Sequence, residues 1–197
     1  MNKQVEFFFD VGSPAAYLAY TQLPKIAAGA GAAIVWRPML LGGVFKATGN
    51  ASPVLVPAKG KWMMGDLARW AGRHGVPLRM PDPFPINTLT LMRGAVGMQL
   101  RQPARFAAYL DAVYTAVFGQ GLAMGDPAVV RGVLERAGFD ATAFEALVAD
   151  PEVKQALIAN TDEAVARGAF GAPTMFVGDE MHFGQDRLEF VAAALTR

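Results

Sequence analysis

The stretch VEFFFDVGSPAAYLAY, residues 5–20, decides the fold of this chain. Its three consecutive phenylalanines at 7–9 predict a central strand that is covered on both faces, because a strand with one exposed face would alternate apolar and polar residues. The apolar run stops at Asp10, and Pro14 suits the first position of a helix, where its missing N–H has no partner to lose. We therefore expect a strand, a tight turn and a helix whose N-terminal cap is Ser13.

The position of Ser13 allows two interpretations. Several backbone N–H groups are unpaired at a helix N-terminus and the helix dipole favours negative charge there, so Ser13 could belong to an anion-binding site. The simpler interpretation is that its hydroxyl only caps the helix. Residues 5–20 alone leave both interpretations open.

Composition limits the class of protein. The chain has 197 residues, of which 53% are hydrophobic, enough for one sizeable domain or for a small domain with a large insertion. Its 18 basic and 17 acidic residues form no run of one sign, which argues against nucleic-acid and anionic-membrane partners. No apolar run approaches the ~20 residues of a membrane span, and acidic residues interrupt the N-terminal segment where a signal peptide is apolar. We expect a cytoplasmic protein.

The chain contains no cysteine, which excludes disulfides, cysteine-ligated zinc and any mechanism that uses a thiol of the protein itself. The two histidines, His74 and His182, lie far apart in sequence and suggest no metal site. His74 falls near the end of an expected helix at Gly75, and His182 falls in an expected strand. We interpret both as structural residues.

The first third of the chain predicts a parallel βαβ unit. The first helix should cover 14–28 and end at the Gly29 and Gly31 pair, and AIVWR at 33–37 reads as a second strand. Residues 38–61 are rich in glycine and proline and predict an irregular loop at the C-terminal edge of the sheet. Ligands dock at such edges, so this loop is a second candidate region.

The middle of the chain predicts helices. Asp126-Pro127 and Asp150-Pro151 are start signals, and Gly138 and Gly168 are stop signals. Helical periodicity predicts two buried stripes and assigns most tryptophans and methionines to the core, some of them lining a cleft. The stripes are Met63, Leu67 and Trp70, and Phe106, Tyr109, Leu110, Val113 and Val117; the other large residues in question are Trp36, Trp62, Met64, Met80 and Met92.

The C-terminal segment predicts α/β structure again. Thr174–Val177 and Glu180–Phe183 read as a hairpin around Gly178-Asp179, and Asp186 should cap a final helix with Glu189 three residues on. The chain is therefore an α/β domain interrupted by a large all-helical insertion. The expected division is residues 1–61 with 160–197 for the α/β domain, and 62–159 for the insertion.

This order of elements, with Ala-Pro-Thr before the hairpin, resembles the thioredoxin-like superfamily. Within it, FFFDVGSPAAYLAY, LLGGVFKATGN, GAPT and FGQDRLEF resemble the 2-hydroxychromene-2-carboxylate isomerases and the related kappa-class glutathione transferases over essentially the whole chain. In thiol oxidoreductases of the superfamily, the position of Ser13 belongs to the nucleophilic cysteine of a Cys-x-x-Cys motif. Here the four residues are Ser13, Pro14, Ala15 and Ala16, so disulfide exchange is excluded. Many isomerase relatives carry a larger aromatic residue at the second alanine.

The resemblance implies that glutathione supplies the sulfur. A free thiol has a pKa of about 8.5, and lowering it by about two requires about 2.7 kcal/mol. A hydroxyl that donates a charge-assisted hydrogen bond, worth about 1.5–3 kcal/mol, together with a helix N-terminus is of that size. We infer that Ser13 stabilises the thiolate and does not attack a substrate itself. The implied reaction is reversible thiolate addition to an unsaturated chromene carboxylate, ring opening, bond rotation and release of unchanged glutathione.

The resemblance also implies the other site residues. Asn50 and Lys59 should contact glutathione, and Ala172 with a cis Pro173 should present backbone groups to its cysteinyl part. Substrate contacts are implied for Lys46 and Asn87, although Asn87 could be an ordinary helix cap and the two lysines could be solvated. Two residues at the start of the last helix should hold the γ-glutamyl end of glutathione: Gln185 and Asp186.

Two alternative functions remain at this stage. A kappa-class-like transferase would use the same thiolate but release a conjugate, and a cysteine-less thioredoxin-like module would bind extended peptides beside Pro173. The preferred reading has glutathione as cofactor, a small aromatic carboxylate as substrate and a homodimer as the assembly.

Overall fold

The computed structural model describes residues 3–197. Four strands form a mixed sheet in the order β2-β1-β3-β4. Strand β1 (Gln4–Phe9) runs parallel to β2 (Ala33–Pro38), with Phe7 opposite Trp36. Strands β3 (Thr174–Val177) and β4 (Glu180–Phe183) form an antiparallel hairpin, and β3 pairs antiparallel with β1. The parallel unit and the C-terminal hairpin predicted from the sequence are confirmed.

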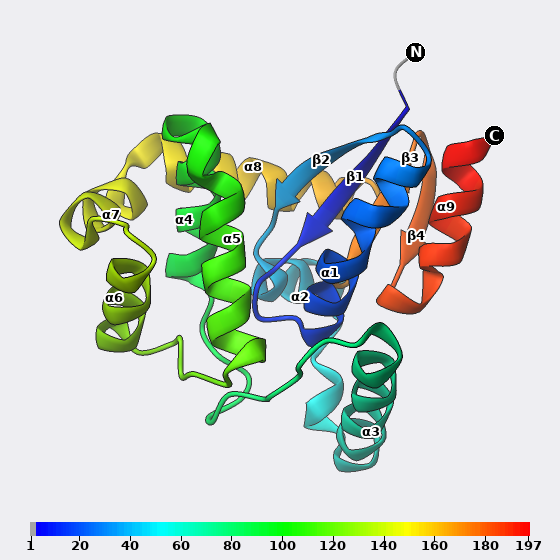
Figure 1. Cartoon of the computed structure of the whole chain (residues 1–197), viewed down its shortest axis with the longest axis horizontal. Helices are drawn as coiled ribbons and strands as arrows, with labels where there is room; N and C mark the ends of the chain where they lie inside the picture. Colours follow the sequence, from blue (N-terminus) through cyan, green and yellow to red (C-terminus); the bar gives the residue numbers. More distant parts are fainter. Residues whose placement is uncertain (1–2) are drawn as a thin grey trace.

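Helices cover both faces of the sheet (Figure 1). Phe8 points to one face, where it packs with Val44 and Phe176, while Phe7 and Phe9 pack into the larger core on the other face. This arrangement confirms the central strand that the three phenylalanines predicted. The helices beside Phe8 are α2 (Leu41–Thr48) and α8 (Pro151–Ala166), and those on the other face are α1 (Pro14–Gly29) and α9 (Leu188–Thr196).

Of the remaining helices, α4 to α7 gather at one side of the sheet, while α3 lies apart from them and packs against α1 (Figure 1). The caps predicted at Asp126 and Asp150 are confirmed, because each carboxylate accepts an N–H of its own helix. The predicted boundaries at 61/62 and 159/160 fall inside α3 and α8, so we retain the division as a proposal in which these two helices each span both parts. The remaining helices are α3 (Pro57–His74), α4 (Leu89–Arg101), α5 (Phe106–Tyr114), α6 (Pro127–Arg136) and α7 (Ala141–Ala149), with short turns at Pro53–Leu55, Pro103–Arg105 and Thr115–Gly119.

The prediction of an irregular loop over 38–61 is wrong. Residues 41–48 form α2, and α3 begins at Pro57. Helix α2 starts without a cap from its own N-cap residue, but its Leu41 N–H donates to the Asp10 carboxylate at 2.8 Å. Gly43 lies where an added Cβ would be 3.1 Å from Thr161 of α8, so the glycine permits a close approach of the two helices.

One further sequence prediction is wrong. Asp186 does not cap the last helix, because a 3-10 turn at Gln185–Arg187 precedes α9, and its Oδ2 accepts from Arg187 Nη1 at 2.6 Å. The stripe predicted on α3 faces the core, since Leu67 is buried and Met63 and Trp70 are half-buried against it. Trp62, which is 64% exposed on the same helix, is one of the large residues that lie outside the core.

We expect Gly94→Ala to destabilise the helical part of the chain. A Cβ on Gly94 would lie 2.6 Å from Phe144 Cε2 and would also strike the hydroxyl of Tyr109, which is buried and donates to Leu91 O. Overpacking of this kind costs about 1–3 kcal/mol, more than the helix propensity that alanine gains. Urea unfolding measures the difference.

The matched control is Gly72→Ala in α3, where nothing lies within 4 Å of the added Cβ. This change should leave stability unchanged or raise it by up to about 1 kcal/mol. Equal effects of the two substitutions would contradict the packing account of Gly94.

Candidate active site

Ser13 joins the start of α1 to a distant loop. Its Oγ accepts the Ala16 N–H at 3.1 Å, which is the predicted cap, and donates to the carbonyl oxygen of Ala172 at 2.8 Å. Pro14 occupies the first position of α1, and the Ser13 N–H donates to Asp10 O. The side chain is buried at one end of the sheet. Both interpretations of Ser13 therefore stay compatible, because one hydroxyl caps the helix and still has a proton to donate.

The Ala172–Pro173 peptide bond is cis, as predicted, and it faces the helix start. The Pro173 carbonyl accepts the N–H of Gly184, which ties this loop to the segment before the last helix. A thiolate bound beside Ser13 would compete with the Ala172 carbonyl for the hydroxyl proton. A negatively charged sulfur is favoured in this competition, because hydrogen bonds to charged acceptors are the stronger ones.

Asp10 organises the turn that carries Ser13. Its carboxylate is 1% exposed and accepts three hydrogen bonds: from the Gly12 N–H at 2.9 Å, from the Leu41 N–H at 2.8 Å and from the Thr88 hydroxyl at 3.0 Å. These partners belong to the turn itself, to the start of α2 and to the start of α4. One side chain thus fixes three segments that meet beside Ser13.

Burial raises the pKa of the Asp10 carboxyl above its ordinary value, although the hydrogen bonds from Gly12, Leu41 and Thr88 favour the ionised form. Within residues 3–197 no Lys, Arg or His lies in ion-pair distance of it. The hydroxyl of Tyr114 is also buried and has no hydrogen-bond partner in the described part of the chain. Burial raises the pKa of Tyr114, and the charge of Asp10 adds to that effect.

Asn50 is held against the loop that leads to Ala172. Its Nδ2 donates to Phe170 O at 2.8 Å, and its Oδ1 accepts the Ala51 N–H at 2.8 Å. Phe170 packs on Phe183 with a ring separation of 4.4 Å, and both rings are partly exposed. The structure therefore brings Asn50 to the same loop as Ala172, with an exposed aromatic pair beside it.

Gln185 and Asp186 lie directly after the Gly184 N–H that binds Pro173 O. Gln185 is buried beside the start of α1, and its Oε1 has no hydrogen-bond partner among the described residues. Asp186 is exposed, and the preceding Gly184 has a positive φ of 96°, a backbone conformation that favours glycine. This segment presents an exposed carboxylate and an unsatisfied buried amide next to the Ser13 loop.

The structure does not bring the other predicted residues into contact with Ser13. Lys46 is exposed in the last turn of α2, and Lys59 is exposed in the first turn of α3, beside a hollow that Trp62 also lines. Asn87 Oδ1 accepts the Leu89 N–H at 3.0 Å and so caps α4 next to Thr88. Their roles in binding stay predictions.

Neither histidine forms a second candidate catalytic or metal site in the described residues. His182 is buried, and burial lowers its pKa; His74 closes α3 against Trp70. Within residues 3–197, no three His, Cys, Asp or Glu side chains are grouped closely enough to hold a metal ion. The helices of that part of the chain are also too short or too polar to cross a membrane.

The comparison with protein families decides the classification. The family described as "DSBA-like thioredoxin domain" matches residues 4–196. The chain belongs to this family. The matching range covers the β1–α1 turn, the helical segment and the cis-proline loop, so the resemblance predicted from the sequence motifs is confirmed over the whole fold.

Within the DsbA-like family, the chain is similar in sequence to enzymes. It is 35% identical to the 2-hydroxychromene-2-carboxylate isomerase of Sphingobium xenophagum over 99% of both chains. It is 29% identical to glutathione S-transferase kappa 1 of Homo sapiens, over 99% of this chain and 92% of that one. A solved structure of a 2-hydroxychromene-2-carboxylate isomerase superposes with a TM-score of 0.85 at 34% identity, covering 98% of this chain and 94% of the other. The predicted membership of the isomerase group is confirmed.

Asp10 is the residue of the candidate site that the sequence interpretation missed. It was recognised only as the end of an apolar strand. Its partners Leu41 and Thr88 lie 31 and 78 residues away, so local pattern could not assign them. An acidic residue between a fully buried strand and a serine-proline helix start was the available signal, because a carboxylate held close to a buried strand needs hydrogen-bond donors from other segments.

Proposed function

We propose that this DsbA-like protein is a glutathione-dependent isomerase of 2-hydroxychromene-2-carboxylate-type aromatic compounds. The observation that carries the proposal is the position of the Ser13 hydroxyl, which caps α1 and donates toward the cis-proline loop. The isomerase relatives at 35% identity support the reaction, and the kappa-class relatives support glutathione. A cytoplasmic homodimer, also predicted, belongs to the same proposal.

The residues around Ser13 fit glutathione. The Ala172 backbone would pair with its cysteinyl part, and Asn50, already bound to Phe170 O, would contact it from the other side of the loop. Gln185 has an amide oxygen without a partner, and Asp186 offers a carboxylate to the γ-glutamyl ammonium group. When bound, glutathione supplies a thiolate that can add reversibly to a conjugated double bond.

The chain itself has three tasks in this reaction. Ser13 donates a hydrogen bond from its hydroxyl to the sulfur and so stabilises the thiolate, helped by the N-terminus of α1. Asp10 holds the turn so that the hydroxyl keeps this direction. Lys46 and Asn87 would hold the carboxylate and oxygen atoms of the substrate, as the sequence predicted. Since none of these side chains forms a bond to the substrate, the catalytic contribution of the protein is binding, orientation and pKa control.

The deciding experiment measures free thiol during turnover of 2-hydroxychromene-2-carboxylate. Isomerisation should proceed to equilibrium with no loss of glutathione, and omission of glutathione should abolish it. The kappa-class relatives favour a second function, conjugation, in which one thiol disappears for each substrate converted. Calorimetry tests the third possibility, since a peptide-binding module would capture extended peptides and show no affinity for glutathione.

We expect Lys59→Met to raise the KM for glutathione about two- to five-fold with little change in kcat, because it removes a charge that pairs with a glutathione carboxylate. Lys59 is exposed in the first turn of α3 and makes no ion pair within residues 3–197. The matched control is Lys61→Met, two residues further on α3 and outside the hollow that Lys59 lines. Equal KM values for the two variants would remove Lys59 from the site.

A further inference from the structure

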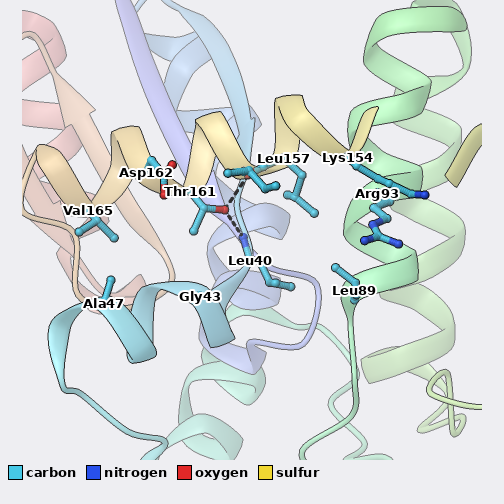
Figure 2. Close-up of a pocket in the computed structure, with 11 residues that line it drawn as sticks. Leu40, Gly43, Ala47, Leu89, Arg93, Lys154, Leu157, Thr161, Asp162 and Val165 are labelled. Atoms are coloured by element: carbon cyan, nitrogen blue, oxygen red, sulfur yellow. Dashed lines mark hydrogen bonds between the residues drawn. The ribbon is translucent and has the colours of Figure 1, made fainter. Parts of the chain in front are cut away.

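A cavity of about 200 Å³ lies between α2, α8 and the start of α4 (Figure 2). Its walls are mostly apolar, with Leu40, Leu89, Leu157 and Ile158 among them. Neither Ser13 nor the Ala172 loop lines it. Pockets for drug-sized ligands measure about 300–1,000 Å³, so this cavity suits a single ring or a short branched chain.

Two cationic side chains stand at one end of this cavity. Arg93 comes from α4 and Lys154 from α8, and Figure 2 shows them next to each other. Neither side chain makes an ion pair within residues 3–197. The acidic residues closest to Lys154 in sequence, Asp150 and Glu152, are engaged by Arg101. Two like charges therefore share one end of an apolar cavity, and no acidic side chain of the described residues pairs with either, an arrangement that favours an anionic ligand.

The other polar groups of the cavity define how a ligand would lie. The Thr161 hydroxyl donates to Leu157 O and accepts the Leu40 N–H, so it is occupied by the protein. Asp162 is exposed at the opposite end, about 12 Å along α8 from Lys154 at 1.5 Å per residue. An anionic group is attracted to the Arg93 end and repelled by Asp162, which leaves the apolar middle for the body of the ligand.

We propose that this cavity is a second binding site, separate from the Ser13 site, for a small aromatic carboxylate. The carboxylate pairs with Arg93 and Lys154, and the ring lies against Leu40, Leu89 and Leu157. Arg93 can bind a carboxylate through two parallel N–H groups, which Lys154 supplements as a point charge. The site does not depend on glutathione.

The test uses 4-(trifluoromethyl)benzoate as probe, observed by fluorine NMR with the full chain. We expect it to bind about ten-fold more tightly than 4-(trifluoromethyl)benzamide, which has the same shape without the charge. Arg93→Gln and Lys154→Gln should each weaken the benzoate about five-fold or more and leave the amide unchanged. Ala47→Phe, which places a ring at the cavity wall, should abolish binding of both probes.

Lys61→Gln, at an exposed lysine of α3 outside the cavity, is the charge control and should leave benzoate binding unchanged, while Lys46→Gln reports any benzoate that binds at the proposed substrate site. Thermal unfolding verifies that each variant is folded. The proposal is overturned if the benzoate does not bind, if it binds no better than the amide, or if Lys46→Gln weakens it while Arg93→Gln and Lys154→Gln do not.

Discussion

Ser13→Ala should raise the pKa of the bound glutathione thiol by about one to two and, through the smaller thiolate fraction, slow isomerisation about 3- to 25-fold at neutral pH. The alanine removes the hydroxyl that donates at 2.8 Å toward the Ala172 loop, and with it the donor that a thiolate would use. The helix dipole remains, so part of the pKa shift should survive. Titration of the thiolate absorbance in the presence of the protein measures the pKa directly.

The same substitution removes a helix cap, which costs about 0.5–2 kcal/mol of stability. Asp140→Ala is the matched control, because the Asp140 carboxylate accepts the Ala143 N–H at 2.9 Å in the same position of α7, far from the site. It should lower stability by a similar amount and leave the thiol pKa unchanged. An unaltered thiol pKa in Ser13→Ala would mean that the hydroxyl only caps α1.

The strand, turn and helix around Ser13 were predictable because their determinants lie within a few residues of each other. Three adjacent phenylalanines placed β1 inside the sheet, and Pro14 placed the start of α1. The loop that faces Ser13 could not be predicted from local sequence in the same way. Ala172 is 159 residues away, and only the resemblance to a known family connected the two before the structure was available.

The errors occur where a distant side chain decides local structure. Helix α2 looked like a loop because its glycines are poor helix formers and its cap, Asp10, precedes it by 31 residues. The close packing of Gly43 on Thr161 explains why glycine is present there at all. Asp186 had the spacing of a helix cap, but Gly184 has a positive φ of 96° and a 3-10 turn follows it.

Asp10→Ala should lower the free energy of unfolding by about 3 kcal/mol or more, because the Gly12 N–H, the Leu41 N–H and the Thr88 hydroxyl lose a buried acceptor together. It should also lower kcat under conditions in which the variant is fully folded, since the turn that carries Ser13 is no longer tied to α2. The readouts are urea unfolding and kcat measured where the variant is fully folded. Wild-type turnover in a folded Asp10→Ala protein would contradict a positioning role.

Asp10→Asn separates the charge from the hydrogen bonds. An amide has one acceptor oxygen, whereas Gly12 and Leu41 donate to opposite oxygens of the carboxylate, so one N–H must face the amide NH₂ group. This conflict costs about 1–3 kcal/mol, and removal of a buried charge offsets part of it. Asp10→Asn should therefore be more stable than Asp10→Ala and less stable than wild type.

The difference in stability between wild type and Asp10→Asn should depend on pH. Burial raises the pKa of Asp10 above the ordinary value of 3.8, so the folded protein keeps a proton on this carboxyl where the unfolded chain has released it. Unfolding then releases a proton, and the wild-type free energy of unfolding loses this contribution as pH rises from 3.8 through the raised pKa. Because asparagine does not titrate, the advantage of wild type should be largest in acid and shrink toward neutral pH. Urea unfolding of both proteins across this range measures it, and an advantage that grows with pH would show that the hydrogen bonds to Asp10 outweigh its burial.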